Sequence, residues 1–146
     1  MRKHILTVAG LALVASTAWA DDAPGTLSVR FEGLRSAKGM IRACLTRDPK
    51  LLAHCEQDPA ALKASVAAGP GAHMDFAAVP PGDYVLAVIH DENSNNKLDT
   101  AFGIPREGFG FSRNPAIHFG PPSFEAAKFH IGTGATELTV KMKYFL

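Results

Sequence analysis

Oxygen-bearing groups recur at alternate positions in residues 91–99, which is the spacing of a calcium-binding loop. Positions 1, 3, 5, 7 and 9 of this loop are Asp91, Asn93, Asn95, Lys97 (through its backbone carbonyl) and Asp99. Asn96 stands where such loops have glycine, and Phe102 stands where they have a bidentate glutamate. The pattern therefore predicts a weak Ca²⁺ site, and the alternative is an Asx-rich turn that binds no ion.

A second group of candidate residues lies in residues 102–114, which are rich in glycine and phenylalanine. Glycine allows close approach of the backbone, and aromatic rings with arginine can form a stacking surface for a sugar, a peptide or another cell-envelope component. The candidate ligand-binding residues are Arg106, Glu107, Phe109, Phe111 and Arg113. In the alternative interpretation, the phenylalanines close one end of the fold and Arg106 pairs with a carboxylate.

Catalysis has less support from the sequence. A cell-envelope hydrolase would take its acid and base from His90, Glu92 or Glu107. The sequence has neither a Gly-x-Ser-x-Gly elbow nor a His-Glu-x-x-His motif. A single histidine that closes an apolar strand is more often a hydrogen-bonded structural residue. The residues therefore favour a non-enzymatic protein.

The two cysteines, Cys44 and Cys55, are separated by ten residues. In an oxidising compartment, such a pair is most simply a disulfide, and two free buried thiols are the alternative. Zinc modules use tight Cys-x-x-Cys pairs, which this chain lacks.

The first 20 residues have the order of a cleavable secretory signal. Arg2 and Lys3 precede an apolar run over residues 5–15, and Ala18 and Ala20 supply the small residues of a cleavage site. The apolar run is about 11 residues long, whereas a membrane-spanning helix needs about 20. We therefore expect cleavage after Ala20, a single domain over residues 21–146, no membrane span in the mature chain, and a periplasmic or extracellular location.

The overall charge of the chain gives no support to one class of partner. Its 15 Lys and Arg residues nearly balance its 14 Asp and Glu residues. A near-neutral chain without a basic cluster gives no electrostatic argument for binding nucleic acid or an anionic membrane.

Alternating apolar residues predict several short strands with one buried face. The alternation is found in residues 27–31, 41–45, 74–78 and 138–144, and a continuous apolar run over residues 84–89 predicts a central strand buried on both faces. Residues 48–63 have helical character, with Asp58 as the N-cap of a short helix. Residues 91–122 lack periodicity and contain many aromatic residues, which predicts one long ordered loop. The fold class is therefore all-β, a single antiparallel sandwich of about seven strands, with a small β-barrel as the alternative.

Four segments together resemble an exported bacterial family, domain of unknown function 2141. They are PGDY (residues 81–84), HDENSNNKLD (90–99), GIPREGFGFS (103–112) and PSFEAA (122–127), in the order of that family. Asn96 stands where the family usually has glycine. The resemblance implies a signal peptide and a β-sandwich, and it implies no particular activity.

From these observations we expect an exported, non-enzymatic binding or accessory module that contacts an unidentified cell-envelope ligand or protein through residues 91–122. The rival interpretations are the hydrolase described above and a purely structural envelope protein whose long loop only caps the core.

Overall fold

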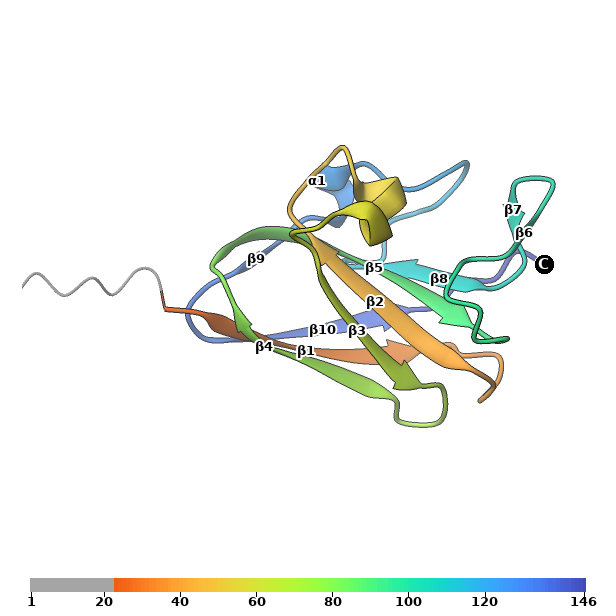
Figure 1. Ribbon diagram of the computed structural model, residues 1–146, viewed down its shortest axis with the longest axis horizontal. Coiled ribbons are helices and arrows are strands. Elements are labelled where there is room, and N and C mark those ends of the chain that lie inside the picture. The colour runs from red at the N-terminus through yellow and green to blue at the C-terminus, as the bar shows by residue number, and fades with distance from the viewer. Residues whose placement is uncertain (1–22) are drawn as a thin grey trace, which may run out of the picture.

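The computed structural model describes residues 23–146, and two β-sheets pack face to face in it (Figure 1). The predicted signal over residues 1–20 lies outside the described residues. The first sheet has the order β10–β1–β4, formed by β1 (Gly25–Glu32), β4 (His73–Val79) and β10 (Ala135–Lys141). β4 pairs antiparallel with β1, whereas β10 runs parallel to it, so the expectation of an entirely antiparallel sandwich is wrong for this one pair.

The second sheet has the order β3–β2–β5–β8. It contains β2 (Met40–Thr46), β3 (Leu62–Ala67), β5 (Gly82–Asp91) and β8 (Gly108–Phe111), and β9 (Phe129–Ile131) pairs with the first residues of β5. Two-residue strands β6 (Thr100–Ala101) and β7 (Ile104–Pro105) form a separate hairpin. The β-sandwich predicted from the sequence is confirmed, and the sheets of residues 23–146 form no closed barrel.

The core lies between the sheets and consists of the alternating apolar residues. Leu27 and Val29 of β1, Ile41 and Leu45 of β2 and Leu86 of β5 are completely buried. Burying one such side chain contributes roughly 1.5–3 kcal/mol. This apolar burial holds the two sheets together.

β5 is the central strand, as its apolar run predicts. Its outward face is buried in its first half because Val85 packs with Leu52 and Ala127 in a second, smaller cluster. These two partners belong to the 3₁₀ helix η1 (Leu52–Gln57) and to α1 (Phe124–Ala127), which lie over this sheet in Figure 1. Within residues 23–146, no helix is long and apolar enough to span a bilayer.

The predicted helix with Asp58 as its N-cap is wrong. The helical segment ends at Gln57, and the buried Asp58 carboxylate accepts hydrogen bonds from the Thr46 hydroxyl (2.6 Å) and the Ala60 backbone N–H (2.8 Å). The chain then continues as β3, whose alternating residues Leu62 and Val66 pair with β2. The sequence did not predict this strand, because its short run contains two alanines, a residue that is depleted in strands.

The predicted disulfide is confirmed. Cys44 of β2 and Cys55 of η1 are bonded, with their Cα atoms 6.0 Å apart. The bond joins η1 to the sheet that it covers.

Candidate functional site

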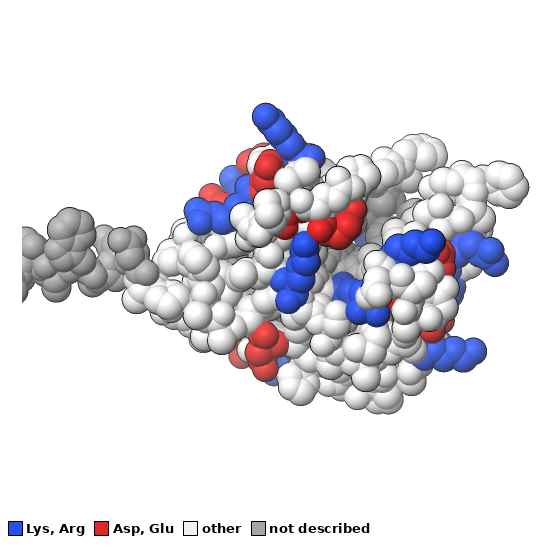
Figure 2. Space-filling view, in the orientation of Figure 1, with Lys and Arg blue, Asp and Glu red and all other residues white. Residues whose placement is uncertain are grey.

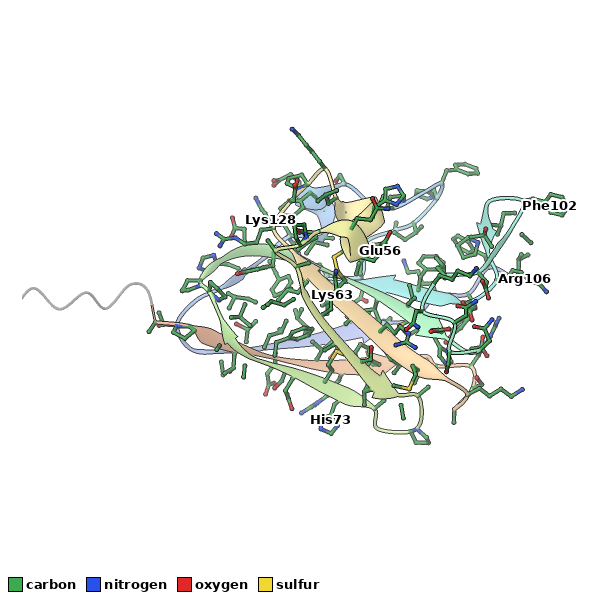
Figure 3. The ribbon with its side chains drawn as sticks, in the orientation of Figure 1. Glu56, Lys63, His73, Phe102, Arg106 and Lys128 are labelled. Carbon is green, nitrogen blue, oxygen red and sulfur yellow. A yellow bond between two sulfur atoms is a disulfide. The ribbon has the colours of Figure 1, made fainter. Side chains whose placement is uncertain are left out.

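The segment from the end of β5 to the start of β8 forms one end of the sandwich, and it is more regular than the predicted loop. The β6–β7 hairpin (residues 100–105, hereafter the hairpin) projects from this end, and Phe102 and Arg106 lie on it and at its base in Figure 3. β8 returns to the sheet and pairs with β5 from Ala87 to His90. The expectation of an aperiodic loop over residues 91–122 is therefore wrong for β8, whose strand character was hidden by its two glycines.

Those glycines are required by close packing. At Gly108 a side chain would occupy the space of the Tyr144 ring, and at Gly110 it would meet Val140. β8 can therefore lie against the C-terminal segment only because it lacks side chains at these two positions.

Asp91 organises the start of the loop from a completely buried position. Its Oδ1 accepts the backbone N–H of Asn95 (2.9 Å), and its Oδ2 accepts that of Asn96 (2.9 Å) and the Nε–H of Arg42 (2.6 Å). Burial by itself raises the pKa of Asp91, but the Arg42 guanidinium and the two N–H groups outweigh burial and lower the pKa below its usual value. Asp91 is therefore a charged structural anchor for residues 91–96.

Glu107 holds the two ends of the same loop together. Its side chain is 5% exposed; Oε1 accepts the backbone N–H of Glu92 and Oε2 accepts that of Asp99, each at 3.0 Å. Asp99 in turn accepts the side-chain amides of Asn95 and Asn93, and these two bonds lower its pKa. The carboxylates of Glu107 and Asp99 are thus occupied by donors from residues 91–99.

The oxygens of the predicted Ca²⁺ ladder face these internal donors. The Asn93 and Asn95 side-chain oxygens accept the backbone N–H groups of Asn95 and Lys97, at 3.2 and 3.1 Å. Asn96 has a φ of 68°, a left-handed conformation that asparagine tolerates. These contacts are those of an Asx-rich turn. Weak Ca²⁺ binding by this loop stays a prediction, because an ion would have to displace the N–H groups from the oxygens.

A thermal melt of residues 21–146 in EDTA or in several millimolar Ca²⁺ decides between the two interpretations. With a dissociation constant of about 0.1 mM, millimolar Ca²⁺ stabilises the fold by about 1.4 kcal/mol, which raises the midpoint by about 3–6 °C. The double variant Asp91→Asn with Asp99→Asn should lose this increase. Equal wild-type midpoints in EDTA and in Ca²⁺ would show that the loop is an Asx-rich turn that binds no Ca²⁺.

His90 is completely buried, and both of its ring nitrogens have partners. Nε2 lies 2.8 Å from the Lys38 carbonyl, which can only accept, so Nε2 carries the proton. Nδ1 then accepts the hydroxyl of Tyr144 at 2.8 Å. Burial raises the pKa of Tyr144, which keeps the phenol protonated as the donor. His90 therefore ties the β1–β2 connection to the C-terminal segment.

Glu92 forms an ion pair with Arg35. The Arg35 Nε and Nη2 atoms lie 2.9 and 2.6 Å from Oε1, and the Ser36 hydroxyl donates to Oε2 at 2.8 Å. Burial by itself raises the pKa of Glu92, but the hydrogen bonds from Arg35 and Ser36 outweigh it and lower the pKa. Arg35 also donates to the carbonyls of Arg106 and Leu146 and lies over the Tyr144 ring, with Cζ 4.6 Å from its centroid. One arginine thus joins three segments at this end of the fold.

The candidate ligand-binding residues divide into exposed and supporting positions. Arg106 and Arg113 are exposed, and in the described part of the chain neither is in an ion pair. Phe109 is 5% exposed and stacks edge-to-face on Phe145 and Phe111, with ring centroids 5.1 and 6.4 Å apart. With Glu107 also buried, the surface of this set consists of the two arginines and part of Phe111.

Sequence reasoning did not select the most exposed aromatic residue of this end as a binding residue. Phe102 stands at the turn of the hairpin with a relative exposure of 106% and a positive φ of 52°, and Ile104 beside it is 44% exposed. Its neighbours Ala101 and Gly103 give no amphipathic pattern. The one signal that could have identified it is the Phe102-Gly103 pair, which is typical of a turn between two short strands.

Residues 29–139 match the family described as uncharacterized proteins conserved in bacteria, DUF2141. The chain belongs to the DUF2141 family. The match begins within β1 and ends within β10, and it includes the hairpin and the buried residues Asp91, His90 and Glu107, so the resemblance seen in the sequence is confirmed. No curated protein and no solved structure matches this DUF2141 chain.

Proposed function

We propose that this DUF2141 protein is an exported, non-enzymatic binding module whose contact surface is the hairpin end of the sandwich. The observation that carries the proposal is the position of Phe102, fully exposed at the turn of a projecting hairpin with Arg106 exposed at its base. A large apolar side chain at a projecting turn contributes nothing to the core, and its exposed neighbour Ile104 adds to an apolar patch of the kind that marks interaction sites.

The base of the hairpin is rigid enough for such a role. Arg106 donates its backbone N–H to the Asp99 carbonyl at 2.8 Å, and its own carbonyl accepts from Arg35 at 2.7 Å. Glu107 fixes the adjacent backbone from its buried position. A contact surface held in one conformation loses less conformational entropy on binding than a flexible loop.

Two further observations support export. The Cys44–Cys55 disulfide is of the kind that persists in oxidising compartments. The N-terminal sequence has the order of a secretory signal.

The hydrolase interpretation has less support from the geometry. His90, Glu92 and Glu107 are each occupied by structural partners, and two of the three are buried. Two hollows on the described surface are lined by other residues, one around Asp75 and Glu137 and one around Asp83 and His130. An acid and a base that serve a substrate would converge on a hollow.

Substitution of the hairpin tests whether it binds or only caps the core. Phe102→Ser and Arg106→Ala should each reduce recovery of a component from cell-envelope extract by about tenfold, a loss of about 1.4 kcal/mol of binding free energy. Their thermal midpoints should stay within about 2 °C of wild type, since exposed substitutions change stability by less than about 0.5 kcal/mol. Lys63→Ala, an exposed cation on β3, is the matched control and should retain full recovery. Lower midpoints with unchanged recovery would identify the hairpin as a structural cap.

A further inference from the structure

Exposed apolar side chains gather at the hairpin end of the molecule. The described part of the chain has five exposed large apolar residues. Two are in the hairpin, Phe102 and Ile104, and two are at the C-terminal end, Phe145 and Leu146; the fifth is Phe119. Arg35 connects these two pairs, because its guanidinium donates to the carbonyls of both Arg106 and Leu146. The base of the hairpin and the C-terminal residues are therefore neighbours, and together they carry the exposed apolar side chains of this surface.

The acidic and basic residues around this surface differ in their exposure. Asp91 and Glu107 are buried, Glu92 is paired with Arg35, and Asp99 accepts two side-chain amides. By contrast, three cations of this end are exposed and take part in none of the ion pairs of the described residues; they are Lys38, Lys97 and Arg106. Figure 2 shows an uncharged projecting tip at this end, with Lys and Arg side chains around its base and Asp and Glu atoms between them. The exposed side chains outside these pairs are therefore positive, although the whole chain is nearly neutral.

The shape of this surface favours a lipid interface over a protein pocket. The hairpin has two residues in each strand, and its turn residues Phe102 and Gly103 both have positive φ, so the phenylalanine projects outward from a narrow base. A bilayer accepts a projecting apolar group among its acyl chains and cations against its phosphates, without a preformed concave site. The hairpin carries apolar groups at its tip and cations at its base, as a contact with acyl chains and lipid phosphates requires.

We propose that the hairpin docks on an anionic phospholipid surface, with Phe102 and Ile104 inserted and Arg106, Lys97 and Lys38 against the lipid phosphates. The inference rests on the proposed function and names the partner of that same surface. Each cation near such a surface strengthens binding by about fivefold, and burial of a phenylalanine strengthens it by about tenfold or more. The association is reversible and weakens as salt screens the cations.

Tryptophan fluorescence tests the insertion directly. The sequence has a single tryptophan, Trp19, within the predicted signal, so Phe102→Trp places a reporter at the hairpin turn of the exported protein. Its emission should shift to the blue with vesicles of phosphatidylcholine and phosphatidylglycerol, and brominated acyl chains should quench it. The control is His73→Trp, because His73 is an exposed residue of β4, and this variant should show neither effect.

Cosedimentation with the same vesicles measures the two contributions separately. Phe102→Ser should bind about tenfold more weakly than wild type, Arg106→Ala about fivefold more weakly, and Lys63→Ala equally well. Pure phosphatidylcholine vesicles should retain much less protein. Failure of the wild type to bind anionic vesicles, or wild-type binding by Phe102→Ser, overturns the lipid proposal. If recovery of a protein from envelope extract still depends on Phe102, the lipid proposal alone fails; if that dependence is also absent, the proposed function fails as well.

Discussion

Replacing Arg42 with methionine lowers the free energy of unfolding by about 3 kcal/mol at neutral pH, which corresponds to about 10 °C in the thermal midpoint. Arg42 Nε lies 2.6 Å from Oδ2 of Asp91, whose side chain is completely buried, while the Arg42 side chain is 24% exposed. Without the guanidinium, Asp91 keeps two backbone donors and loses its compensating charge. A buried carboxylate without a cation is strongly destabilising.

The control for this substitution is Arg30→Met, because Arg30 is an exposed arginine on β1. Urea denaturation should show a change of less than about 0.5 kcal/mol for the control. If Arg42→Met and Arg30→Met have the same unfolding free energy, the ion pair with Asp91 contributes nothing to the fold.

The effect of Arg42→Met depends on pH in a defined direction. The pKa of Asp91 is lowered in the folded protein, so the stabilisation from its charge is fully present above the unfolded pKa of about 4. This stabilisation is lost as the pH falls through the lower folded pKa. The difference between wild type and Arg42→Met should therefore be constant at neutral pH and shrink as the pH falls through the pKa of Asp91 in the variant, which burial without the guanidinium raises above the wild-type value.

Loss of the Cys44–Cys55 disulfide has a comparable effect. The bond closes a loop between residues 11 apart in sequence, and the chain-entropy model assigns such a loop about 3 kcal/mol. The expected decrease in the thermal midpoint is on the order of 10 °C. The bond also holds η1 in place, and Leu52 of η1 covers Val85 on the outer face of the central strand.

Cys44→Ser and reduced wild type should have the same midpoint, because both lose the same constraint. A melt with and without reductant measures this change, and reductant should leave the midpoint of Cys44→Ser unchanged. An unchanged wild-type midpoint after complete reduction, verified by thiol labelling, would show that the bond does not stabilise the fold.

The strands with clear alternation could be predicted from the sequence alone. Leu27, Val29 and Phe31 have a period of two, and only a strand places all three on one face. The disulfide could also be predicted, because the two cysteines of the chain allow a single intramolecular pair. β3 and β8 were missed because alanine and glycine carry little information about the side of a sheet that they occupy.

The candidate site depended far more on tertiary structure. The spacing of Asp91, Asn93 and Asn95 is the same for a cation loop and for an Asx-rich turn, and only the three-dimensional contacts show which donors face the oxygens. His90 and Glu107 were candidates for catalysis, but both bind structural partners. His90 bonds to the Lys38 carbonyl, 52 positions away in the sequence. Glu107 bonds to the backbone of Glu92 and Asp99, which are 15 and 8 positions away. A local pattern does not specify contacts over such separations.

The sequence by itself determined the β-sandwich, the disulfide pair and the family, because these follow from periodicity, cysteine number and the order of motifs. Only the tertiary structure decided which charges and which phenylalanines reach the surface. A count of charged residues treats buried Asp91 and exposed Arg106 alike, and a count of aromatic residues treats buried Phe109 and exposed Phe102 alike. The physical reason is that burial is set by the packing of distant segments, here β5, β8 and the C-terminal residues around Arg35, and not by the residues on either side in the chain.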